Sequence, residues 1–594
     1  MELYAWQEAC LNAWEKNHHR GIINVITGAG KTVTALEGMV RLSHDLKSRG
    51  KTLRTRIVVP TTALAVQWYK GVQSYLAQKK TPGWSIGLYY GEQKDRKDSD
   101  ILILVVNSAR IGLSRQILED MDAGHHVLLI ADECHHYGGE ENRKIFSFMQ
   151  YARFRPLQYA SLGLSATPQC PGYDTVLVPA LGHEIYAYGL RQAVYDGRVT
   201  PYAVMTVQLN LTGDEEQLYG QYTDALRNLH PRLLSAYPDL QHLPPALFLS
   251  ALQKIARDLQ DPSSMVQRYL NLIYLRRDLV CQARSRGDCA VHLISRLPRN
   301  DKVIFFCEKI TQAESIYRRL MVAFPSQVGL YHSQLPKDLR ARVLREFREG
   351  TIRILASCKA LDEGVDVPDA TVGVVVSSTT ARRQRLQRLG RILRRAEGKE
   401  MATLYFFHIP LAMEESLYLP EDGDVHPTVA LRYFHREAAF DCDEYADLAL
   451  SLLAVCVRKG YRDEQLWEVR RQLEKGLVLS DWLLPRATLE EKLRQEKDQD
   501  QRNYIICMLR MAGLLEKRNA GEALPRLETN DDIFRLRGLW PEIRDEEDTD
   551  ESLWITEEDL EIGDTGAWDD ENAEETPEAA DTILMFHPET GTWS

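Results

Sequence analysis

Two stretches of the chain alternate short apolar runs with amphipathic segments. In residues 1–205 the segments between the runs, such as Lys31–Ser48 and Thr62–Lys79, carry apolar residues at helical spacing. The runs are apolar at almost every position, which is typical of strands buried on both faces of a parallel sheet. The predicted strands are Gly21–Thr27, Thr55–Pro60, Asp100–Ser108, His126–Glu133 and Tyr159–Thr167. This alternation predicts a doubly wound α/β domain over residues 1–205.

The same alternation returns later in the chain and predicts a second α/β domain over residues 296–427. Its predicted strands are Asp301–Cys307, Ser326–His332, Ile352–Cys358, Thr371–Ser378 and Thr403–Ile409. The strand pattern is lost over residues 206–295, where Pro245–Gln260 and Ser264–Arg286 favour helices. We therefore expect a helical insertion or linker between the two α/β domains.

After the second α/β domain, residues 428–540 are helical in pattern and highly charged, which predicts a helical accessory domain. Residues 541–594 carry 20 acidic residues and a single arginine, a net charge of −19 against −12 for the whole chain. The preceding 540 residues are therefore mildly basic, at +7. A basic body joined to a low-hydrophobicity acidic tail suggests that the body contacts nucleic acid and that the tail is flexible.

Composition excludes several classes of protein. At 594 residues, 44% hydrophobic and 27% charged, the chain has the make-up of a multidomain globular protein. No apolar run approaches the roughly 18 residues of a membrane span, and the first residues lack a signal-peptide pattern. Ten cysteines without a C-x-x-C pair argue against a zinc ribbon or a disulfide framework. We expect a cytoplasmic protein with no membrane partner.

The most specific motif is T-G-A-G-K-T, which directly follows a predicted strand and opens a predicted helix. A glycine loop between a strand and a helix N-terminus binds phosphates through its backbone N–H groups. Val25 stands where the usual motif has its first glycine. We expect Lys31 to reach the β- and γ-phosphates and Thr32 to hold Mg²⁺. The residues predicted to surround the phosphates are Thr27, Gly28, Ala29, Gly30, Lys31 and Thr32.

A second motif, D-E-C-H at Asp132–His135, ends another predicted strand. An acidic pair at the carboxyl end of a parallel strand faces the crevice where α/β domains bind ligands. We expect Asp132 to bind Mg²⁺ and Glu133 to orient or deprotonate the attacking water.

A third motif, Q-R-L-G-R-I-L-R at Gln387–Arg394, places arginines near one helical face. One interpretation is a solvated basic helix. The other is that Arg391 and Arg394 stabilise charge on the γ-phosphate from the second domain, with Gln387 sensing the same phosphate.

Taken together, these motifs resemble those of the superfamily-two helicases and translocases over roughly residues 1–410. Other segments resemble further motifs of that superfamily in the same order. They are Trp6-Gln7, Pro60-Thr61 with Gln67-Trp68, Asn107-Ser108, Ser165-Ala166-Thr167, Val303–Glu308 and Ala356–Asp369. The resemblance implies two RecA-like domains with ATP and Mg²⁺ bound between them. No arginine precedes Trp6-Gln7, which departs from the usual adenine-reading motif.

The resemblance also assigns roles to individual residues. Gln7 would read adenine, and Gly364 and Asp366 would complete the nucleotide site from the second domain. Ser165 and Thr167 would link that site to strand contacts, with His135 beside them. Phosphates of the nucleic acid would be gripped without sequence reading by Thr61, Asn107, Ser108 and Ser357.

Within the superfamily, the D-E-C-H-H and L-D-E-G-V-D-V-P-D forms are more similar to XPB-like repair helicases, UvsW-type phage helicases and restriction-enzyme motors than to DEAD-box proteins. This implies an ATP-dependent DNA helicase or translocase acting on duplex or forked DNA, in DNA repair or anti-phage defence. A nuclease or other subunit would dock on residues 428–594. An RNA-directed remodeller and a nucleotide-gated interaction protein remain alternatives. The acidic tail has three interpretations: solvated segment, partner-docking segment, or nucleic-acid mimic that inhibits the motor.

Overall fold

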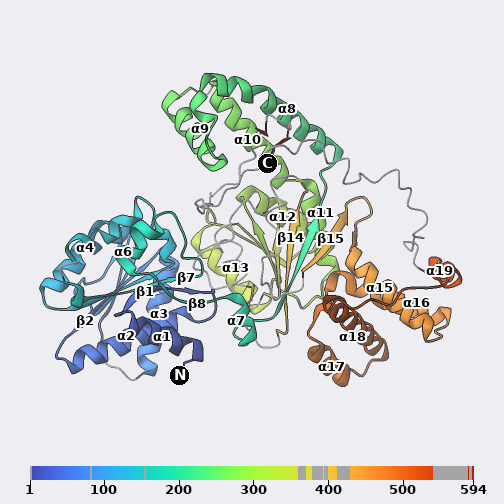
Figure 1. The fold of residues 1–594 in the computed structure, drawn as a ribbon, viewed down its shortest axis with the longest axis horizontal. Helices are drawn as coiled ribbons and strands as arrows, with labels where there is room; N and C mark the ends of the chain where they lie inside the picture. The colour runs from blue at the N-terminus through green and yellow to red at the C-terminus, as the bar shows by residue number, and fades with distance from the viewer. Residues whose placement is uncertain are drawn as a thin grey trace. The chain divides into compact units, whose positions relative to one another are not determined.

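The computed structural model describes residues 3–79, 83–152, 155–261, 263–358, 370–377, 392–393, 399–410, 428–539, 586–587 and 592–593. The chain divides into two compact units, the first built from residues 1–294, 299–428 and 578–594 and the second from residues 295–298 and 429–577. The first unit contains two sheets, and each sheet has the parallel strands that the apolar runs predict (Figure 1).

The first sheet has the strand order β4-β3-β5-β2-β6-β7-β1-β8, and all its neighbouring strands are parallel except β3 and β4. Its strands are β1 (Arg20–Val25), β2 (Leu53–Val59), β3 (Ile86–Tyr90), β4 (Gln93–Lys94), β5 (Ile101–Val105), β6 (His126–Asp132), β7 (Tyr159–Ser165) and β8 (Glu184–Tyr188). The five predicted strands are all present. The run predicted as a strand to Ser108 ends earlier, because helix α4 begins at Val106.

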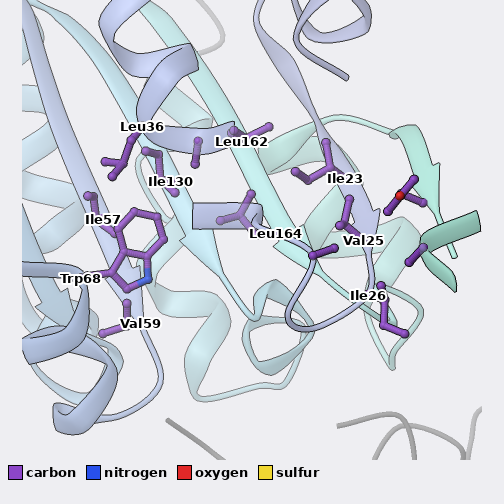
Figure 2. Close-up of a cluster of buried hydrophobic side chains, with 14 of the residues drawn as sticks. Ile23, Val25, Ile26, Leu36, Ile57, Val59, Trp68, Ile130, Leu162 and Leu164 are labelled. Atoms are coloured by element: carbon purple, nitrogen blue, oxygen red, sulfur yellow. The ribbon is translucent and has the colours of Figure 1, made fainter. Parts of the chain in front are cut away.

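Helices cover both faces of this sheet. They are α1 (Ala5–Lys16), α2 (Lys31–Ser48), α3 (Thr62–Gln78), α4 (Val106–Asp122), α5 (Met149–Ala152), α6 (Val178–Leu181) and α7 (Leu190–Tyr195). Successive strand residues point to opposite faces. Ile57 and Val59 therefore pack with α1, α2 and α3, as Figure 2 shows around Trp68, whereas Val58 packs with α4. Burial of the strands on both faces explains their near-continuous apolar sequence.

The second sheet has the order β11-β12-β10-β13-β14-β9 within the first unit, again with parallel neighbours. Its strands are β9 (Tyr202–Gln208), β10 (Val303–Cys307), β11 (Val328–Tyr331), β12 (Ile354–Cys358), β13 (Val372–Val375) and β14 (Ala402–His408), with helices α11 (Arg284–Arg296), α12 (Ile310–Ala323) and α13 (Lys337–Glu349). The two α/β domains predicted from the sequence are thereby confirmed. The predicted boundary between residues 205 and 206 falls inside β9, whose partner β14 lies 200 residues later.

Three helices occupy the segment between the first sheet and α11. They are α8 (Gly213–Ala236), α9 (Pro245–Leu259) and α10 (Met265–Cys281). Their apolar faces share a core that includes Leu226, Phe248 and Tyr269. The helix predicted to run over Ser264–Arg286 is broken after Cys281, and α11 then begins at Arg284.

The second unit begins with an antiparallel pair of strands, β15 (Thr428–Phe434) and β16 (Ala439–Asp441), which the helical prediction missed. Helices follow as predicted: α15 (Asp443–Arg458), α16 (Asp463–Leu479), α17 (Arg486–Gln495), α18 (Gln499–Asn519) and α19 (Asn530–Arg537). Near the C-terminus, β17 (Phe586–His587) pairs with β18 (Thr592–Trp593). The predicted acidic tail otherwise lies outside the described residues.

Among the residues that the structure describes, no helix is both long and apolar enough to cross a membrane. The same residues contain no group of three potential metal-binding His, Cys, Asp or Glu side chains. All ten cysteines are free thiols, nine of them buried.

Candidate active site

The predicted site residues of the first domain gather at one edge of its sheet. The phosphate loop follows β1, the acidic pair ends β6, and Ser165 ends β7. These three strands are neighbours in the order β6-β7-β1 and run parallel, so their carboxyl ends lie at the same edge. Strand order thus brings together motifs that are more than 100 residues apart, with Ser165 on the middle strand.

The phosphate loop has the backbone that its glycines permit. Gly28 and Gly30 have φ angles of +88° and +112°, a region that side-chain-bearing residues rarely adopt. Helix α2 begins at Lys31, immediately after Gly30, so the first N–H groups of the helix are presented at the loop. Within the described part of the chain the buried Thr27 hydroxyl has no hydrogen-bond partner. Ala29 is buried, and Thr32 lies in the first turn of α2.

Lys31 faces the acidic pair across the loop. Its Nζ lies 3.5 Å from Oε1 of Glu133, and both side chains are largely buried. Glu133 itself has a left-handed backbone, with φ of +47°, which is uncommon for a residue other than glycine. Such a backbone is found where the surrounding structure fixes a functional side chain. The arrangement places a cation and a carboxylate where a phosphate would bind.

Asp132 is held by two donors. The indole Nε1 of Trp68 donates to Oδ2 at 2.7 Å, and the backbone N–H of Glu133 donates to Oδ1 at 3.1 Å. Burial and the neighbouring Glu133 carboxylate raise the pKa of Asp132 to about 6, while Lys31 and the Trp68 hydrogen bond act in the opposite direction. Its carboxyl group is therefore fixed in orientation by protein groups on both oxygens.

A polar chain connects the acidic pair to β7. Nδ1 of His135 lies 2.9 Å from Oγ of Ser165 and 3.6 Å from Oε2 of Glu133. The same Ser165 hydroxyl accepts the backbone N–H of Thr167 at 3.0 Å. His135 and Ser165 are both buried. The structure therefore brings together the three residues that the sequence placed in a relay, beside Glu133.

Gln7 lies against the phosphate loop. Its Oε1 accepts the backbone N–H of Tyr4 at 2.9 Å, and its Nε2 donates to the carbonyl of Gly30 at 3.4 Å. Trp6 stacks on Tyr188 with ring centroids 4.7 Å apart. A residue near the N-terminus thus joins the loop that follows β1, as its predicted role in nucleotide binding requires.

The residues predicted to contact nucleic acid in the first domain also follow strand ends. Thr61 comes after β2 and caps helix α3, where its hydroxyl accepts the N–H of Leu64 at 3.3 Å. Asn107 and Ser108 lie in the first turn of α4, just after β5. These positions share the carboxyl edge of the sheet with the phosphate loop. Their contact with nucleic acid stays a prediction.

Ser357 has a different environment. It lies within β12, is almost completely buried, and donates its hydroxyl hydrogen to the carbonyl of Phe305 at 3.0 Å. The hydroxyl thus bonds to the neighbouring strand, and its predicted contact with a phosphate stays untested. The remaining predicted site residues of the second domain lie outside the described residues: Gly364, Asp366, Gln387, Arg391 and Arg394.

One functional contact was not foreseen, namely the bond from Trp68 to Asp132. The sequence marked Gln67-Trp68 as part of a motif but gave the indole no role. Trp68 lies at an inward position of the amphipathic helix α3, which predicts burial. A buried indole N–H needs a hydrogen-bond acceptor. The predicted burial of Trp68 was therefore the one sequence feature that could have indicated a polar partner for its indole.

The site fits a nucleoside triphosphate with Mg²⁺. The loop offers backbone donors, an unpartnered buried Thr27 hydroxyl and the Lys31 ammonium, which suit phosphate oxygens. Asp132 and Thr32 supply the hard oxygen donors that Mg²⁺ prefers.

Comparisons with known proteins give a family match to part of each α/β domain. Residues 1–170 match the family described as “Type III restriction enzyme, res subunit”, and residues 286–396 match “Helicase conserved C-terminal domain”.

Among curated proteins, the chain is similar to the “DNA 3'-5' translocase XPB2” of Sulfurisphaera tokodaii, at 29% identity over 68% of this chain and 80% of that protein. It is also similar to “Putative DNA 3'-5' helicase Rad25” of Halobacterium salinarum, at 23% identity over 66% of this chain. The match spans 52% of that Rad25 protein, so this chain corresponds to about half of its length.

Two solved structures are similar in fold at low sequence identity. One is the “Pyrococcus furiosus Hef helicase domain”, with a TM-score of 0.47 and 15% identity, covering 70% of this chain and 97% of that one. The other is “a putative HsdR subunit of a type I restriction enzyme from Vibrio vulnificus”, with a TM-score of 0.47 and 20% identity, covering 72% of this chain and 68% of that one.

Proposed function

We propose that the chain is a superfamily 2 helicase related to the XPB-like translocases, and that it acts as an ATP-dependent DNA helicase or translocase. The observation that carries the proposal is the meeting of Lys31 and Glu133 at 3.5 Å, with Ser165 and His135 directly beside them. This arrangement unites a phosphate-binding cation, a base and a polar link toward the strand-contact residues.

In the proposed cycle, the phosphate loop and Lys31 bind the phosphates of ATP, and Gln7 holds the loop through Gly30. Lys31 and Glu133 neutralise one another in the structure. Binding of the phosphates gives Lys31 a stronger anionic partner, because phosphate oxygens carry more charge than one carboxylate. Glu133 is then released to accept a hydrogen bond from the attacking water.

Glu133 is the proposed general base for hydrolysis, and its left-handed backbone fixes its direction. Asp132 and Thr32 would hold Mg²⁺, which neutralises charge that develops on the phosphates. The two donors on Asp132 keep its oxygens oriented toward the ion.

Two connections lead from this site toward the proposed DNA contacts. His135 and Ser165 join Glu133 to the segment that contains Thr167. Trp68 joins Asp132 to helix α3, whose first turn is capped by Thr61. A change at the phosphates therefore shifts groups that lead to the carboxyl-edge loops, which would grip the DNA backbone together with Asn107, Ser108 and Ser357.

The second domain would complete the nucleotide site. We assign Gly364 and Asp366 to nucleotide contacts, Gln387 to phosphate sensing, and Arg391 and Arg394 to stabilising charge on the γ-phosphate. Closure of the two domains on ATP and their release after hydrolysis would move two DNA-binding surfaces relative to one another.

The choice of DNA over RNA is supported by the relatives, since XPB2 and the Rad25 proteins are named as acting on DNA in the 3′-to-5′ direction. We extend both properties to this chain. A role in DNA repair or anti-phage defence, in a cytoplasmic complex with a nuclease or other subunit, belongs to the same proposal.

The test is ATP hydrolysis without nucleic acid and with single-stranded DNA, duplex DNA, forked DNA and RNA, each at two salt concentrations. Stimulation by DNA over RNA, lost in Lys31→Ala and Glu133→Gln, supports the motor. Stimulation by RNA over DNA would replace it with an RNA remodeller. Nucleotide binding with no response to any nucleic acid would favour a nucleotide-gated interaction protein.

A further inference from the structure

The second unit contains an apolar groove that the proposed motor does not use. Most of its lining residues come from helices α15, α17 and α18, whose ribbons Figure 1 labels. Its volume is about 700 Å³. Six aliphatic side chains form most of its apolar surface: Leu452, Val455, Leu493, Ile506, Leu509 and Leu514. Apolar concave surfaces of this kind bind amphipathic segments of other chains or of the same chain.

Gly513 lies beside open space in the groove. It lies in the middle of α18 and lines the groove, and a Cβ atom added there would meet nothing within 4 Å. Its φ angle is helical, so neither the backbone nor the packing requires glycine at this position. Glycine in a helix interior destabilises the helix by about 0.5–1 kcal/mol relative to alanine. Glycine at position 513 therefore destabilises the helix slightly, and in return it leaves the space beside the helix unfilled.

Four basic and three acidic side chains line the groove, a net charge of +1: Lys459, Arg486, Arg510 and Lys517 with Glu490, Glu516 and Glu522. Arg486 pairs with Glu490 at 3.0 Å and lies 3.7 Å from Glu516, so these three side chains together carry a net charge of −1. Lys459 and Lys517 are exposed, and neither has an ion-pair partner in the described part of the chain. An acidic, partly apolar segment therefore matches the groove in both charge and polarity.

The chain leaves the described structure beside this groove. Arg510, which lines the groove, donates to the hydroxyl of Tyr461 at 3.3 Å. Arg535 of helix α19 bonds to the carbonyl of the same Tyr461 at 2.8 Å. Leu539, four residues after Arg535, is the last residue described before the acidic segment. The acidic segment thus starts close to the edge of the groove.

We propose that residues 551–562 of the same chain bind in this groove. They combine the apolar run Leu553, Trp554 and Ile555 with five acidic residues. The apolar run would cover the Gly513 floor and the acids would pair with the rim lysines. The 14 residues from Leu539 to Leu553 span up to about 45 Å when extended. A 21-residue helix such as α18 is only about 30 Å long, so the segment reaches the whole groove.

This proposal does not depend on the motor function. It assigns the acidic tail a binding site on its own accessory domain. A partner that uses the same groove would have to displace a tethered competitor, whose effective concentration is in the millimolar range for short flexible linkers.

The test is amide hydrogen exchange of the full chain, comparing the natural sequence with Gly513→Leu. A Cβ atom at this position has no other atom within 4 Å, so the larger leucine side chain has open space to enter on the groove side of α18. We expect peptides covering residues 551–562 to exchange at least about tenfold faster in the variant, as a docked segment opens. Gly220→Leu is the matched control, since Gly220 is also an open mid-helix position, in α8, and does not line the groove.

A second variant, Trp554→Ala, removes the largest apolar side chain of the tail and leaves the folded unit intact. Trp554→Ala should accelerate amide exchange of the peptides that cover residues 551–562. The double variant Lys459→Glu with Lys517→Glu should accelerate the same exchange to a smaller extent. Exchange of residues 551–562 at the rate of a free peptide in the natural chain would overturn the proposal. Protection that disappears on dilution would also overturn it, because the segment would then occupy the groove of another copy.

Discussion

The two sheets share one architecture but use their carboxyl edges differently. In the first sheet, polar side chains beyond β1, β6 and β7 face one another across a loop, as in the 3.5 Å approach of Lys31 to Glu133. In the described part of the second sheet, polar side chains form hydrogen bonds that link the ends of strands to the helices packed on the sheet. Ser377 donates to Gln312 at 2.9 Å, and Arg286 donates to the carbonyl of Phe407 at 3.0 Å.

The first edge presents polar groups that can bind a ligand, whereas the described polar groups of the second edge stabilise the fold. The first edge keeps polar groups where a ligand can exchange with them, at the cost of a left-handed Glu133 and a buried, unpartnered Thr27 hydroxyl. The described part of the second edge ties its strands together through side-chain bonds. Substitutions at the first edge should therefore affect hydrolysis, whereas substitutions at Arg286 and Ser377, in the described part of the second edge, should affect folding.

The largest expected effect is at the first edge. Lys31→Ala should abolish hydrolysis and weaken ATP binding, whereas Glu133→Gln should keep binding and slow hydrolysis by about 10²–10⁴-fold, as expected for loss of a general base. Fluorescent-nucleotide binding and steady-state hydrolysis measure the two properties separately. Lys47→Ala, on the exposed side of the same helix, is the control. Hydrolysis that survives Glu133→Gln would remove Glu133 from the mechanism.

The next effect is on stability at the second edge. Arg286 is 1% exposed and donates to the carbonyls of Val280, Val376 and Phe407. Arg286→Met would remove the guanidinium donor from the carbonyls of Val376 and Phe407, whereas the Val280 carbonyl would keep the backbone N–H of Ala283. Each buried unsatisfied group costs about 1–3 kcal/mol. We expect unfolding to be easier by about 3 kcal/mol or more, measured by urea denaturation.

Arg318→Met is the control for this prediction, because Arg318 is exposed and its pairing with Glu314 is long at 3.8 Å. It should change stability by less than about 1 kcal/mol. If the two substitutions lower the free energy of unfolding equally, the hydrogen bonds of Arg286 do not stabilise the ends of the strands.

A smaller effect is expected on the stimulation of ATP hydrolysis by DNA. Ser165→Ala removes the hydroxyl that joins His135 to the N–H of Thr167, so DNA stimulation of hydrolysis should fall by up to about tenfold, the value of one hydrogen bond. Hydrolysis without DNA should change little. Ser161→Ala on the same strand, whose hydroxyl donates to the carbonyl of Leu181 and does not contact His135, is the control. A parallel fall of both activities would contradict a coupling role.

The smallest expected effect concerns Asp132. Trp68→Phe keeps an aromatic ring in the core but removes the 2.7 Å donor, so Mg²⁺-dependent nucleotide affinity should fall by about three- to tenfold. Affinity measured without Mg²⁺ should stay unchanged. Trp14→Phe is a matched control, since Trp14 is equally buried and donates to the carbonyl of Ser161 instead. If Trp14→Phe lowers the Mg²⁺-dependent nucleotide affinity by a similar factor, the Trp68 hydrogen bond has no specific role in orienting Asp132.

The sequence by itself determined the elements that depend on local pattern. Ten strand-length apolar runs became strands of two parallel sheets, because burial on both faces leaves such runs almost no polar positions. The T-G-A-G-K-T segment specified its own loop, because only glycine readily adopts the φ angles of +88° and +112° found there. The sequence also marked Asp132 and Glu133 through their place at a strand end.

Only the tertiary structure decided which distant segments meet. The pairing of β9 with β14 joins residues 200 positions apart, and no local pattern marks which sheet a strand enters. The order β6-β7-β1 decided that Ser165 and His135 lie beside Glu133. Packing of α3 delivered the Trp68 indole to Asp132, and the pairing of β12 with β10 buried Ser357 against Phe305. Hydrogen bonds of this kind depend on side-chain positions set by long-range packing, which is why sequence spacing could not predict them.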